Sequence, residues 1–371
     1  MIVRGGLINL KIEIFDVAYG GEGVGRHEGK VCFVPGALPG ETVACLPETE
    51  YKRFTRCKLQ QVITPSPARI EPQCPIAANC PGCAYQHVGY DAELQIKKNQ
   101  LRALMQRLGH IDIEDILVYD SKNNLGYRNK ITLHAAISET KRSLGYVGND
   151  NQTVLDVGRC PLAMNAINED LAAYRSSADF YAMNNKDRVT FRYTNTNGAC
   201  HWRNKSLGIE ILTESTTLGN LQVPAQSFFQ VNPPVANILI EAVTTIIKND
   251  SFDTLMDFYC GVGVFSIAAG KCGVPSTLGV DSDRKAIEAA KQNARDYGLN
   301  GAAFLTQISE NIAADALEPA RSSQALVIVD PPRRGLNRQM INALCKTPPK
   351  KLIYISCAAD TLARDLALLA D

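Results

Sequence analysis

The spacing of apolar residues changes along the chain. In the first part of the chain it predicts β-strands. From residue 10 onward, short apolar runs are separated by glycine and proline. They predict four strands: Leu10–Phe15, Lys30–Val34, Glu41–Leu46 and Lys58–Ile63. Short strands at this spacing are typical of a small β-barrel. Pro65 and Pro67 mark its end, so we predict a first domain over residues 1–66.

A helix and a β-rich region follow. Between Asp91 and Leu108, apolar residues recur at helical spacing, with Asp91 as the expected N-cap and Gly109 as the residue after the last turn. From Ile131 to about Thr217, apolar residues alternate in short runs, which predicts antiparallel strands. We assign residues 67–234 to a central domain.

Strands and helices alternate in the last part of the chain. The pattern predicts helices near 235–247, 264–270, 284–297 and 337–345, and strands at 253–258, 277–281, 325–329 and 351–356. This order is typical of a mainly parallel, doubly wound sheet. We therefore predict an α/β protein whose third domain, residues 235–371, is Rossmann-like.

A glycine-rich turn and two acidic residues, Asp281 and Asp330, lie at the ends of predicted strands. Doubly wound sheets bind ligands at this position. The turn Asp257-Phe-Tyr-Cys-Gly-Val-Gly263 lacks both G-x-G-x-x-G and a Walker lysine, which favours S-adenosylmethionine over a pyrophosphate ligand. Asp281 ends the next strand and could accept hydrogen bonds from both ribose hydroxyls. The alternative is a tight turn without a ligand.

Two further motifs close later strands. In Asp330-Pro-Pro-Arg333 the prolines stiffen a loop that could hold a carboxylate in place, although a plain strand-ending turn is the alternative. Cys357 lies at the end of strand 351–356, before a helix-like segment. A thiol in this position is a candidate nucleophile, and the alternative is a small buried apolar residue.

Composition and cysteine spacing indicate where the protein works and what it binds. No apolar stretch reaches the length of about 18 residues that spans a bilayer, and the start lacks a secretory signal pattern. We therefore expect a cytoplasmic protein without membrane contact.

Disulfides are rare in the cytoplasm, so Cys74, Cys80, Cys83 and the isolated Cys160 indicate a [4Fe–4S] cluster or a structural zinc ion. Unligated thiols are the alternative.

A net charge of +1 gives no strong global attraction for nucleic acid, so local clusters matter more. One such cluster interleaves four cations with two aromatic residues: Tyr51, Lys52, Arg53, Phe54, Arg56 and Lys58. These side chains could hold phosphates and stack on bases. A solvated basic β-edge is the alternative, because edge charges also prevent aggregation.

Taken together, these motifs resemble the RNA (uracil-5-)-methyltransferase family over nearly the whole chain. The shared segments are Gly20–Gly25, the four cysteines, Tyr127–Lys130, Phe228–Asn232, Asp257–Gly263, Asp330–Arg333 and Ser356-Cys357. The resemblance implies an OB-like, TRAM-type RNA-binding barrel and a [4Fe–4S] cluster on Cys74, Cys80, Cys83 and Cys160. It also implies cofactor contacts from Gln230, Tyr259, Asp281 and Asp330, with Cys357 as the nucleophile.

The implied activity is S-adenosylmethionine-dependent methylation of uridine C5 in RNA, through a covalent bond between the cysteine and uracil C6. We favour ribosomal over transfer RNA as substrate and expect a monomer. Ala358 and Ala359 stand where the family has Asn/Asp-Pro, and its catalytic glutamate would follow Asp371. We therefore expect a C-terminally short domain. The alternatives are a non-catalytic RNA-binding protein with this fold and an N-methyltransferase, for which Asp-Pro-Pro-Arg lacks the final aromatic residue.

Overall fold

The computed structural model describes residues 9–204, 208, 210–318 and 324–370. The chain divides into two compact units. The first comprises Met1–Ala103, Ile116–Val118 and His134–Pro161, and the second Leu104–Asp115, Tyr119–Leu133 and Leu162–Asp371. The sequence-based division at residues 66 and 234 remains a prediction, and its ends at residues 1–8 and 371 lie outside the described residues.

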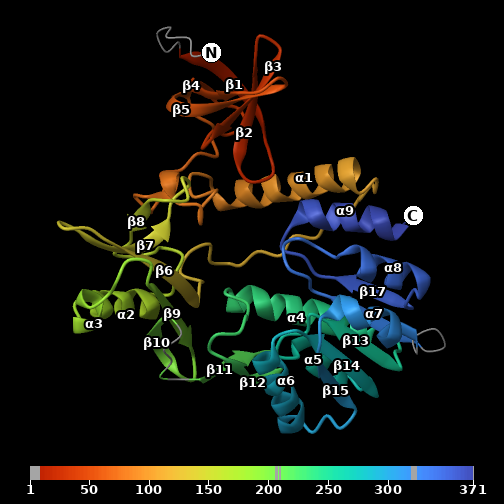
Figure 1. The fold of residues 1–371 in the computed structure, drawn as a ribbon. Helices are drawn as coiled ribbons and strands as arrows, with labels where there is room; N and C mark the ends of the chain where they lie inside the picture. Colours follow the sequence, from red (N-terminus) through yellow and green to blue (C-terminus); the bar gives the residue numbers. More distant parts are fainter. Residues whose placement is uncertain (1–8, 205–207, 209, 319–323, 371) are drawn as a thin grey trace. The chain divides into compact units, whose positions relative to one another are not determined.

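The first unit begins with a closed β-barrel (Figure 1, red to orange). Its strands follow the order β1 (Leu10–Val17), β2 (Glu22–His27), β3 (Lys30–Pro35), β5 (Phe54–Thr64) and β4 (Thr42–Glu50). Alternate residues of these strands point inward. They form a core that includes three cysteine side chains, Cys32, Cys45 and Cys57, each at most 2% exposed. The predicted barrel is confirmed.

Strand β2 is the part of the barrel that the sequence did not predict, because its glycines resemble a turn. A Cβ atom on Gly25 would lie 2.6 Å from the carbonyl oxygen of Glu13, and one on Gly23 would lie 2.7 Å from that of Ala37. Neither distance is tolerated by real Cβ atoms. These glycines therefore allow close packing inside a strand rather than ending it.

A short 3-10 helix, η1 (Ala77–Asn79), and the long helix α1 (Tyr90–Leu108) follow the barrel. The predicted helix is confirmed, but Asp91 lies in its first turn rather than at the N-cap. Leu108, expected on the apolar face, is 45% exposed. The side chain of Gln100 donates to the carbonyl oxygens of Val17 and Ala18, so α1 is fixed to the end of β1.

The predicted antiparallel region is a five-stranded sheet. Its order is β10 (Gly198–Arg203), β9 (Arg188–Thr194), β6 (Lys130–Ile137), β7 (Arg142–Val147) and β8 (Val154–Asp156). The second unit also contains α2 (Asn165–Arg175), α3 (Ala178–Tyr181) and the hairpin of β11 (Ile211–Thr216) and β12 (Gly219–Pro224).

The last part of the second unit is a parallel sheet with helices on both faces, as predicted. The strand order is β15 (Ala302–Thr306), β14 (Ser276–Asp281), β13 (Thr254–Phe258), β16 (Ala325–Val329) and β17 (Lys351–Tyr354). The helices are α4 (Pro233–Lys248), α5 (Val264–Lys271), α6 (Arg284–Asp296), α7 (Ser309–Leu317), α8 (Arg338–Lys346) and α9 (Ala359–Ala370). The pattern had missed β15 and α7.

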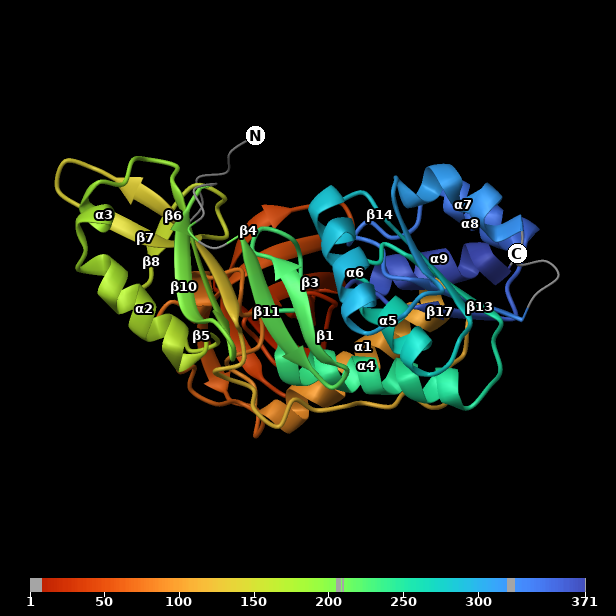
Figure 2. The same cartoon turned by 90° about the horizontal axis from the view of Figure 1, so that it is seen from below.

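The helices form two layers around this sheet. Apolar residues of α7, α8 and α9 pack together with Met256, Val327 and Leu352 of the strands. Residues of α4 and α5 pack with Leu255 and Ile328, the neighbouring strand positions that point the other way. Figures 1 and 2 show α7, α8 and α9 together in blue, and α4, α5 and α6 together in green to cyan. Within the described residues, no helix is long and apolar enough to cross a membrane.

Candidate active site

Four neighbouring strands of the parallel sheet end at the same level. Phe258 of β13 lies opposite Val280 of β14 and Val329 of β16, and Val329 lies opposite Tyr354 of β17. Adjacent strands are about 4.8 Å apart. Side chains that directly follow these four residues are therefore gathered at one edge of the sheet.

Four of the five predicted site residues occupy this edge. Tyr259, Asp281 and Asp330 each directly follow one of the aligned positions on β13, β14 and β16. Cys357 follows β17, the next strand, by three residues. The sheet therefore brings together a tyrosine, two carboxyl groups and a thiol from segments up to about a hundred residues apart. Their roles remain predictions.

The turn between β13 and α5 combines close packing with an open backbone. Gly263 has φ 83°, and a Cβ atom there would lie 3.0 Å from the ring of Phe304. Gly261 has φ 53°, and a Cβ atom there would meet nothing within 4 Å. Gly263 is thus needed to fit the turn against the sheet, whereas Gly261 leaves the backbone open to a bound molecule.

Asp281 supports this turn through its carboxylate. Its Oδ2 accepts a hydrogen bond from the backbone N–H of Gly261 at 2.9 Å, and its Oδ1 accepts one from the N–H of Asp283 at 2.8 Å. Each carboxylate oxygen can accept more than one hydrogen bond. The side chain can therefore hold the protein backbone and still accept bonds from two hydroxyl groups of a ligand.

A third carboxyl group is buried directly behind the turn. Asp257 is 0% exposed, and its Oδ2 accepts from the backbone N–H and the hydroxyl of Ser266 at 3.0 and 2.8 Å. Its Oδ1 is buried without a hydrogen-bond partner in the described structure. Burial raises the pKa of Asp257 to about 7, and the negative charges of Asp330 and Asp281 add to the shift. No role was predicted for Asp257 by itself, because the apolar run around it does not show how deeply the strand is buried.

Burial also raises the pKa of Asp330, to about 6. The edge of the sheet therefore carries carboxyl groups at the ends of three adjacent strands, those of β13, β14 and β16. A cationic ligand at this edge would favour the ionised forms of these carboxyl groups. Perturbed carboxyl groups of this kind are a common property of functional sites.

Cys357 differs from the other cysteines in its surroundings. Only Cys357 and Cys345 are exposed among the described residues, and the thiol of Cys345 contacts the carbonyl oxygen of Leu368 instead of the strand ends. Cys260, in the glycine-rich turn, is buried, and burial raises its pKa well above the ordinary value. Of the cysteines near this edge, Cys357 is the one that a substrate can reach.

Gln230, the fifth predicted residue, lies on the segment that leads into α4. This segment is joined to the strand ends because the hydroxyl of Ser227 donates to Oδ2 of Asp283 at 2.6 Å. Phe229 is 7% exposed and packs in the core, whereas Phe228 is 72% exposed. Gln230 itself is half-buried.

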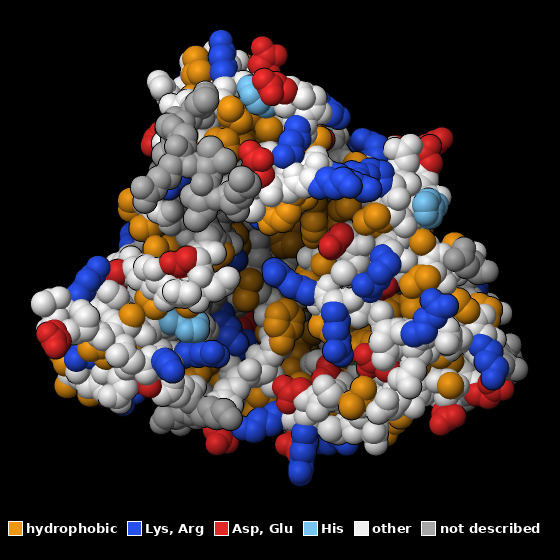
Figure 3. Space-filling model, turned by 45° about the horizontal axis from the view of Figure 1, so that its top comes forward, with side chains coloured by type: hydrophobic (Ala, Val, Ile, Leu, Met, Phe, Trp, Pro, Cys, Tyr) orange, Lys and Arg blue, Asp and Glu red, His pale blue; other side chains and the backbone are white. Residues whose placement is uncertain are grey.

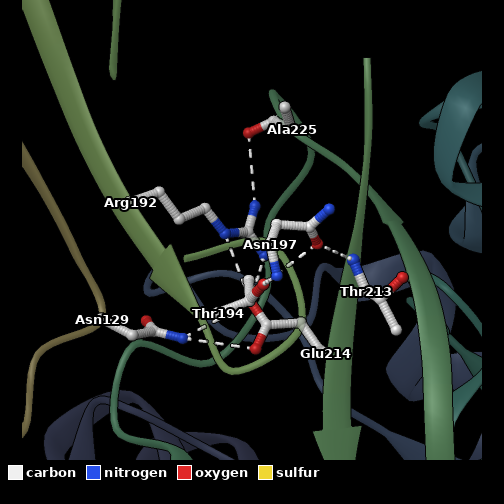
Figure 4. Close-up of polar contacts among 7 residues, drawn as sticks. All are labelled: Asn129, Arg192, Thr194, Asn197, Thr213, Glu214 and Ala225. Carbon is white, nitrogen blue, oxygen red and sulfur yellow. Dashed lines mark hydrogen bonds and ion pairs between the residues drawn. The ribbon is translucent and has the colours of Figure 1, made fainter. Parts of the chain in front are cut away.

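A buried ion pair holds the same segment from its other end (Figure 4). Arg192 on β9 and Glu214 on β11 are 1% and 4% exposed and lie 2.7 Å apart. Arg192 also donates to the carbonyl oxygen of Ala225 at 3.3 Å, and Asn129 donates to Glu214 at 3.4 Å. Burial raises the pKa of Glu214. Burial and the charge of Arg192 lower the pKa of Lys130 to about 8. The pair thus links Tyr127–Lys130 with the segment that carries Gln230.

The four predicted metal ligands lie together in the first unit. Burial raises the pKa of Cys74, and the neighbouring Cys160 and Cys80 add to this effect. A hydrogen bond with Cys80 raises the pKa of Cys83, together with burial and the charges of Cys80 and Cys160. Gln86 joins this group by donating to the sulfur of Cys83 at 3.1 Å. Even so, no group of three or more His, Cys, Asp or Glu residues among those described is arranged to hold a metal ion.

The basic and aromatic residues 51–58 lie at the start of β5 in the barrel. Tyr51 stacks on Phe54 with ring centroids 4.3 Å apart, and Phe54 meets Phe33 edge-on at 5.5 Å. Arg56 lies 3.4 Å from Glu22. The face of the molecule in Figure 3 shows lysine and arginine side chains interspersed with acidic ones. Phe33 was not among the predicted RNA-binding residues, and it contributes a third ring from the neighbouring strand β3.

Two protein families match separate parts of the chain. Residues 216–371 match the family described as tRNA (Uracil-5-)-methyltransferase. Residues 5–46 match the TRAM domain. The first match includes all five predicted site residues, and the second covers most of the barrel.

Curated relatives match almost the whole chain. An uncharacterised RNA methyltransferase of Listeria monocytogenes (serotype 4b) is 27% identical over 416 residues, which cover 98% of this chain and 91% of the relative. The 23S rRNA (uracil(1939)-C(5))-methyltransferase RlmD of Marinomonas sp. is 27% identical over 396 residues, covering 96% of this chain and 87% of the relative.

A solved structure supports the fold. The tRNA (uracil-54, C5)-methyltransferase of Pyrococcus abyssi, crystallised with S-adenosyl-L-homocysteine, superposes with a TM-score of 0.76 and 21% identity. The superposition covers 96% of this chain and 92% of the Pyrococcus chain.

Proposed function

We propose that this chain, a member of the RNA (uracil-5-)-methyltransferase family with an N-terminal TRAM domain, methylates C5 of a uridine through a covalent bond to Cys357. The main support is the position of Cys357, an exposed thiol on the same edge of the sheet as the glycine-rich turn and Asp330. A pure RNA-binding protein would not need an exposed thiol beside a glycine-rich turn of this kind.

S-adenosylmethionine would supply the methyl group as a sulfonium cation. The residues that fit it are Gly261, whose backbone is open, and Asp281, whose carboxylate has spare acceptor capacity. We assign Tyr259, Gln230 and Asp330 to the same site. The carboxyl groups at this edge complement the positive charge of the sulfonium.

The thiolate of Cys357 would add to uracil C6, which is the β-carbon of a conjugated enone. The new S–C6 bond moves an electron pair to C5 and O4, so that C5 becomes a nucleophile. A C5–CH₃ bond then forms while the sulfonium S–CH₃ bond breaks. A base removes the C5 proton, the C5=C6 bond forms again, and the thiolate leaves. The target base must leave its stack to reach Cys357.

An RNA oligonucleotide that contains 5-fluorouridine tests this proposal. Fluorine at C5 cannot leave as a proton does, so the methylated adduct should persist as a band shift on a denaturing gel. We expect the shift with the parent protein and with Cys345→Ala, the matched exposed cysteine, but not with Cys357→Ala. RNA binding by the parent without any adduct would favour the alternative, a non-catalytic RNA-binding protein.

We also assign a [4Fe–4S] cluster to Cys74, Cys80, Cys83 and Cys160, with zinc as the alternative. The neighbouring Cys80 and Cys160 raise the pKa of Cys74 and of Cys83, so the four thiols would repel one another as thiolates. A bound cationic centre would offset this repulsion, and four thiolates suit either an iron–sulfur cluster or zinc. The assignment explains why these thiols lie together.

We further propose that the RNA is ribosomal. The support is the Marinomonas relative, which matches nearly the whole chain and is named for a uracil of 23S rRNA. Residues 51–58 and Phe33 would bind this RNA, because stacked rings and cations suit bases and phosphates.

A further inference from the structure

One buried carboxylate joins three elements next to the candidate site. Asp365 on α9 is 0% exposed. Its Oδ2 accepts hydrogen bonds from the backbone N–H of Leu336 and from the hydroxyl of Tyr354, both at 2.7 Å. Its Oδ1 accepts from Nε and Nη2 of Arg364 at 2.8 and 2.6 Å. Asp365 therefore ties the loop after β16 to β17 and to α9.

The loop after β16 packs directly against the carboxylate of Asp365. Gly335 has φ 76°, and a Cβ atom there would lie 2.4 Å from Oδ2 of Asp365. The Nη2 atom of Arg364 donates to the carbonyl oxygen of Arg334 at 2.8 Å, and the hydroxyl of Thr361 donates to that of Arg333 at 3.2 Å. Helix α9 thus holds the loop through backbone groups of Arg333, Arg334 and Leu336.

The anchored segments carry two of the proposed site residues, Asp330 of the cofactor site and the nucleophile Cys357. The loop begins at Asp330, at the end of β16, and Cys357 lies between β17 and α9. The N–H of Ile355 donates to the carbonyl oxygen of Val329 at 2.8 Å, which joins the two strands just below these groups. Asp365 supports both segments and is itself buried away from solvent.

We propose that Asp365 is a positioning residue that sets the spacing between Asp330 and Cys357. This inference rests on the proposed function of that site. Well-packed apolar residues could replace a buried ionic group without loss of stability, but they could not accept the hydrogen bond of Leu336. Tyr354 keeps its proton for the same contact, because burial and the neighbouring Asp365 raise its pKa.

The variant Asp365→Asn tests the proposal with little change in shape. One oxygen becomes an NH₂ group, which cannot accept from Leu336 and Tyr354 or from Arg364. A misplacement of about 1 Å costs on the order of 100-fold in rate, so adduct formation with the 5-fluorouridine RNA should slow by about that factor. Affinity for S-adenosylhomocysteine should fall less than the rate, because of the proposed cofactor residues only Asp330 adjoins the anchored loop, whereas Tyr259, Asp281 and Gln230 lie on other segments. Asp315→Asn, an exposed position on α7, is the matched control.

Tyr354→Phe supplies a milder second variant that removes one of the four hydrogen bonds. If both residues act through the same contact, the double variant should be no slower than Asp365→Asn alone. Independent, multiplying losses would overturn the proposal. So would parent-like adduct rates in both single variants.

Two readouts do not depend on methylation. We expect hydrogen exchange at the Leu336 amide to become faster in Asp365→Asn and Tyr354→Phe. Alkylation of Cys357 by iodoacetamide, followed by peptide mapping, should also change rate, whereas that of Cys345 should not. If the parent forms no adduct, the proposed function is wrong, and these two rates alone decide whether Asp365 positions the segments. Unchanged rates in both variants would refute the positioning role.

Discussion

The carboxylate of Asp281 accepts a hydrogen bond from the backbone amide of Gly261, 2.9 Å away. The end of β14 thereby fixes the glycine-rich turn that follows β13. Asp281, which is predicted to contact the cofactor, therefore also supports the glycine-rich turn. Substitutions of Asp281 must therefore be compared in a way that separates the two roles.

Replacing Asp281 by alanine should weaken S-adenosylmethionine binding. Losing charge-assisted hydrogen bonds to two hydroxyls costs roughly 2–3 kcal/mol, which corresponds to about 30- to 150-fold in dissociation constant. Asp281→Asn can still accept from Gly261 and should show a smaller loss. Titration calorimetry with Asp315→Ala as control measures both effects. An unchanged dissociation constant in Asp281→Ala would remove this residue from the site.

The pH dependence of stability should reveal Asp257. Its pKa is about 7 in the folded protein and about 3.9 in an unfolded chain, so the folded state binds more protons between these values. Stability should therefore fall as pH rises from about 4 to 7, by up to roughly 1.4 kcal/mol per pH unit. Asp330, with a pKa of about 6, adds to this slope at the lower end. Urea unfolding of Asp257→Asn across this range should give a flatter profile, and a profile parallel to the parent's would show that Asp257 does not titrate there.

The four grouped cysteines should bind iron. Anaerobically purified protein should be brown and contain about four irons per chain. Cys160→Ser should lose the colour and the iron, whereas Cys272→Ser, a half-buried cysteine outside the group, should keep both. Colourless protein with one zinc ion would establish the zinc alternative, and protein without any metal would leave the thiols unligated.

Neutralising the cations of residues 51–58 should weaken RNA binding without affecting the cofactor. The variant changes Lys52, Arg53, Arg56 and Lys58 to glutamine. The logarithm of its RNA-binding constant should depend less steeply on the logarithm of the salt concentration. The slope should decrease by up to the contribution of about four phosphate contacts. The control removes the same charge at exposed helical positions: Lys248, Lys291, Arg295 and Lys346. Equal slopes for both variants would mean that only total charge matters and that residues 51–58 form an ordinary solvated edge.

Most strand ends could be predicted from the sequence because apolar runs stop there. This is why Asp281, Asp330 and Cys357 could be proposed from the pattern, whereas Tyr259 and Gln230 came from the family resemblance. The alignment of the strand ends needed the register of β13, β14, β16 and β17. The glycines of β2 misled the prediction, because packing against Glu13 and Ala37 lies far from them in sequence.

The contacts of Asp257 and Asp365 could not be predicted for a related reason. A single carboxyl residue in a sequence carries no sign of whether it will be buried. Asp257 meets Ser266 nine residues later, and Asp365 meets Leu336 from another element. The same holds for Arg192 and Glu214, whose pairing depends on β9 and β11 lying close together.

The three thiols in the barrel core give this domain a reporter of its own. Cys32, Cys45 and Cys57 are almost completely shielded, so a labelling reagent can reach them only when the strands around them separate. The rate at which they are modified measures how often the barrel opens. Comparing that rate with and without RNA would show how strongly the nucleic acid stabilises the barrel, without introducing any new residue.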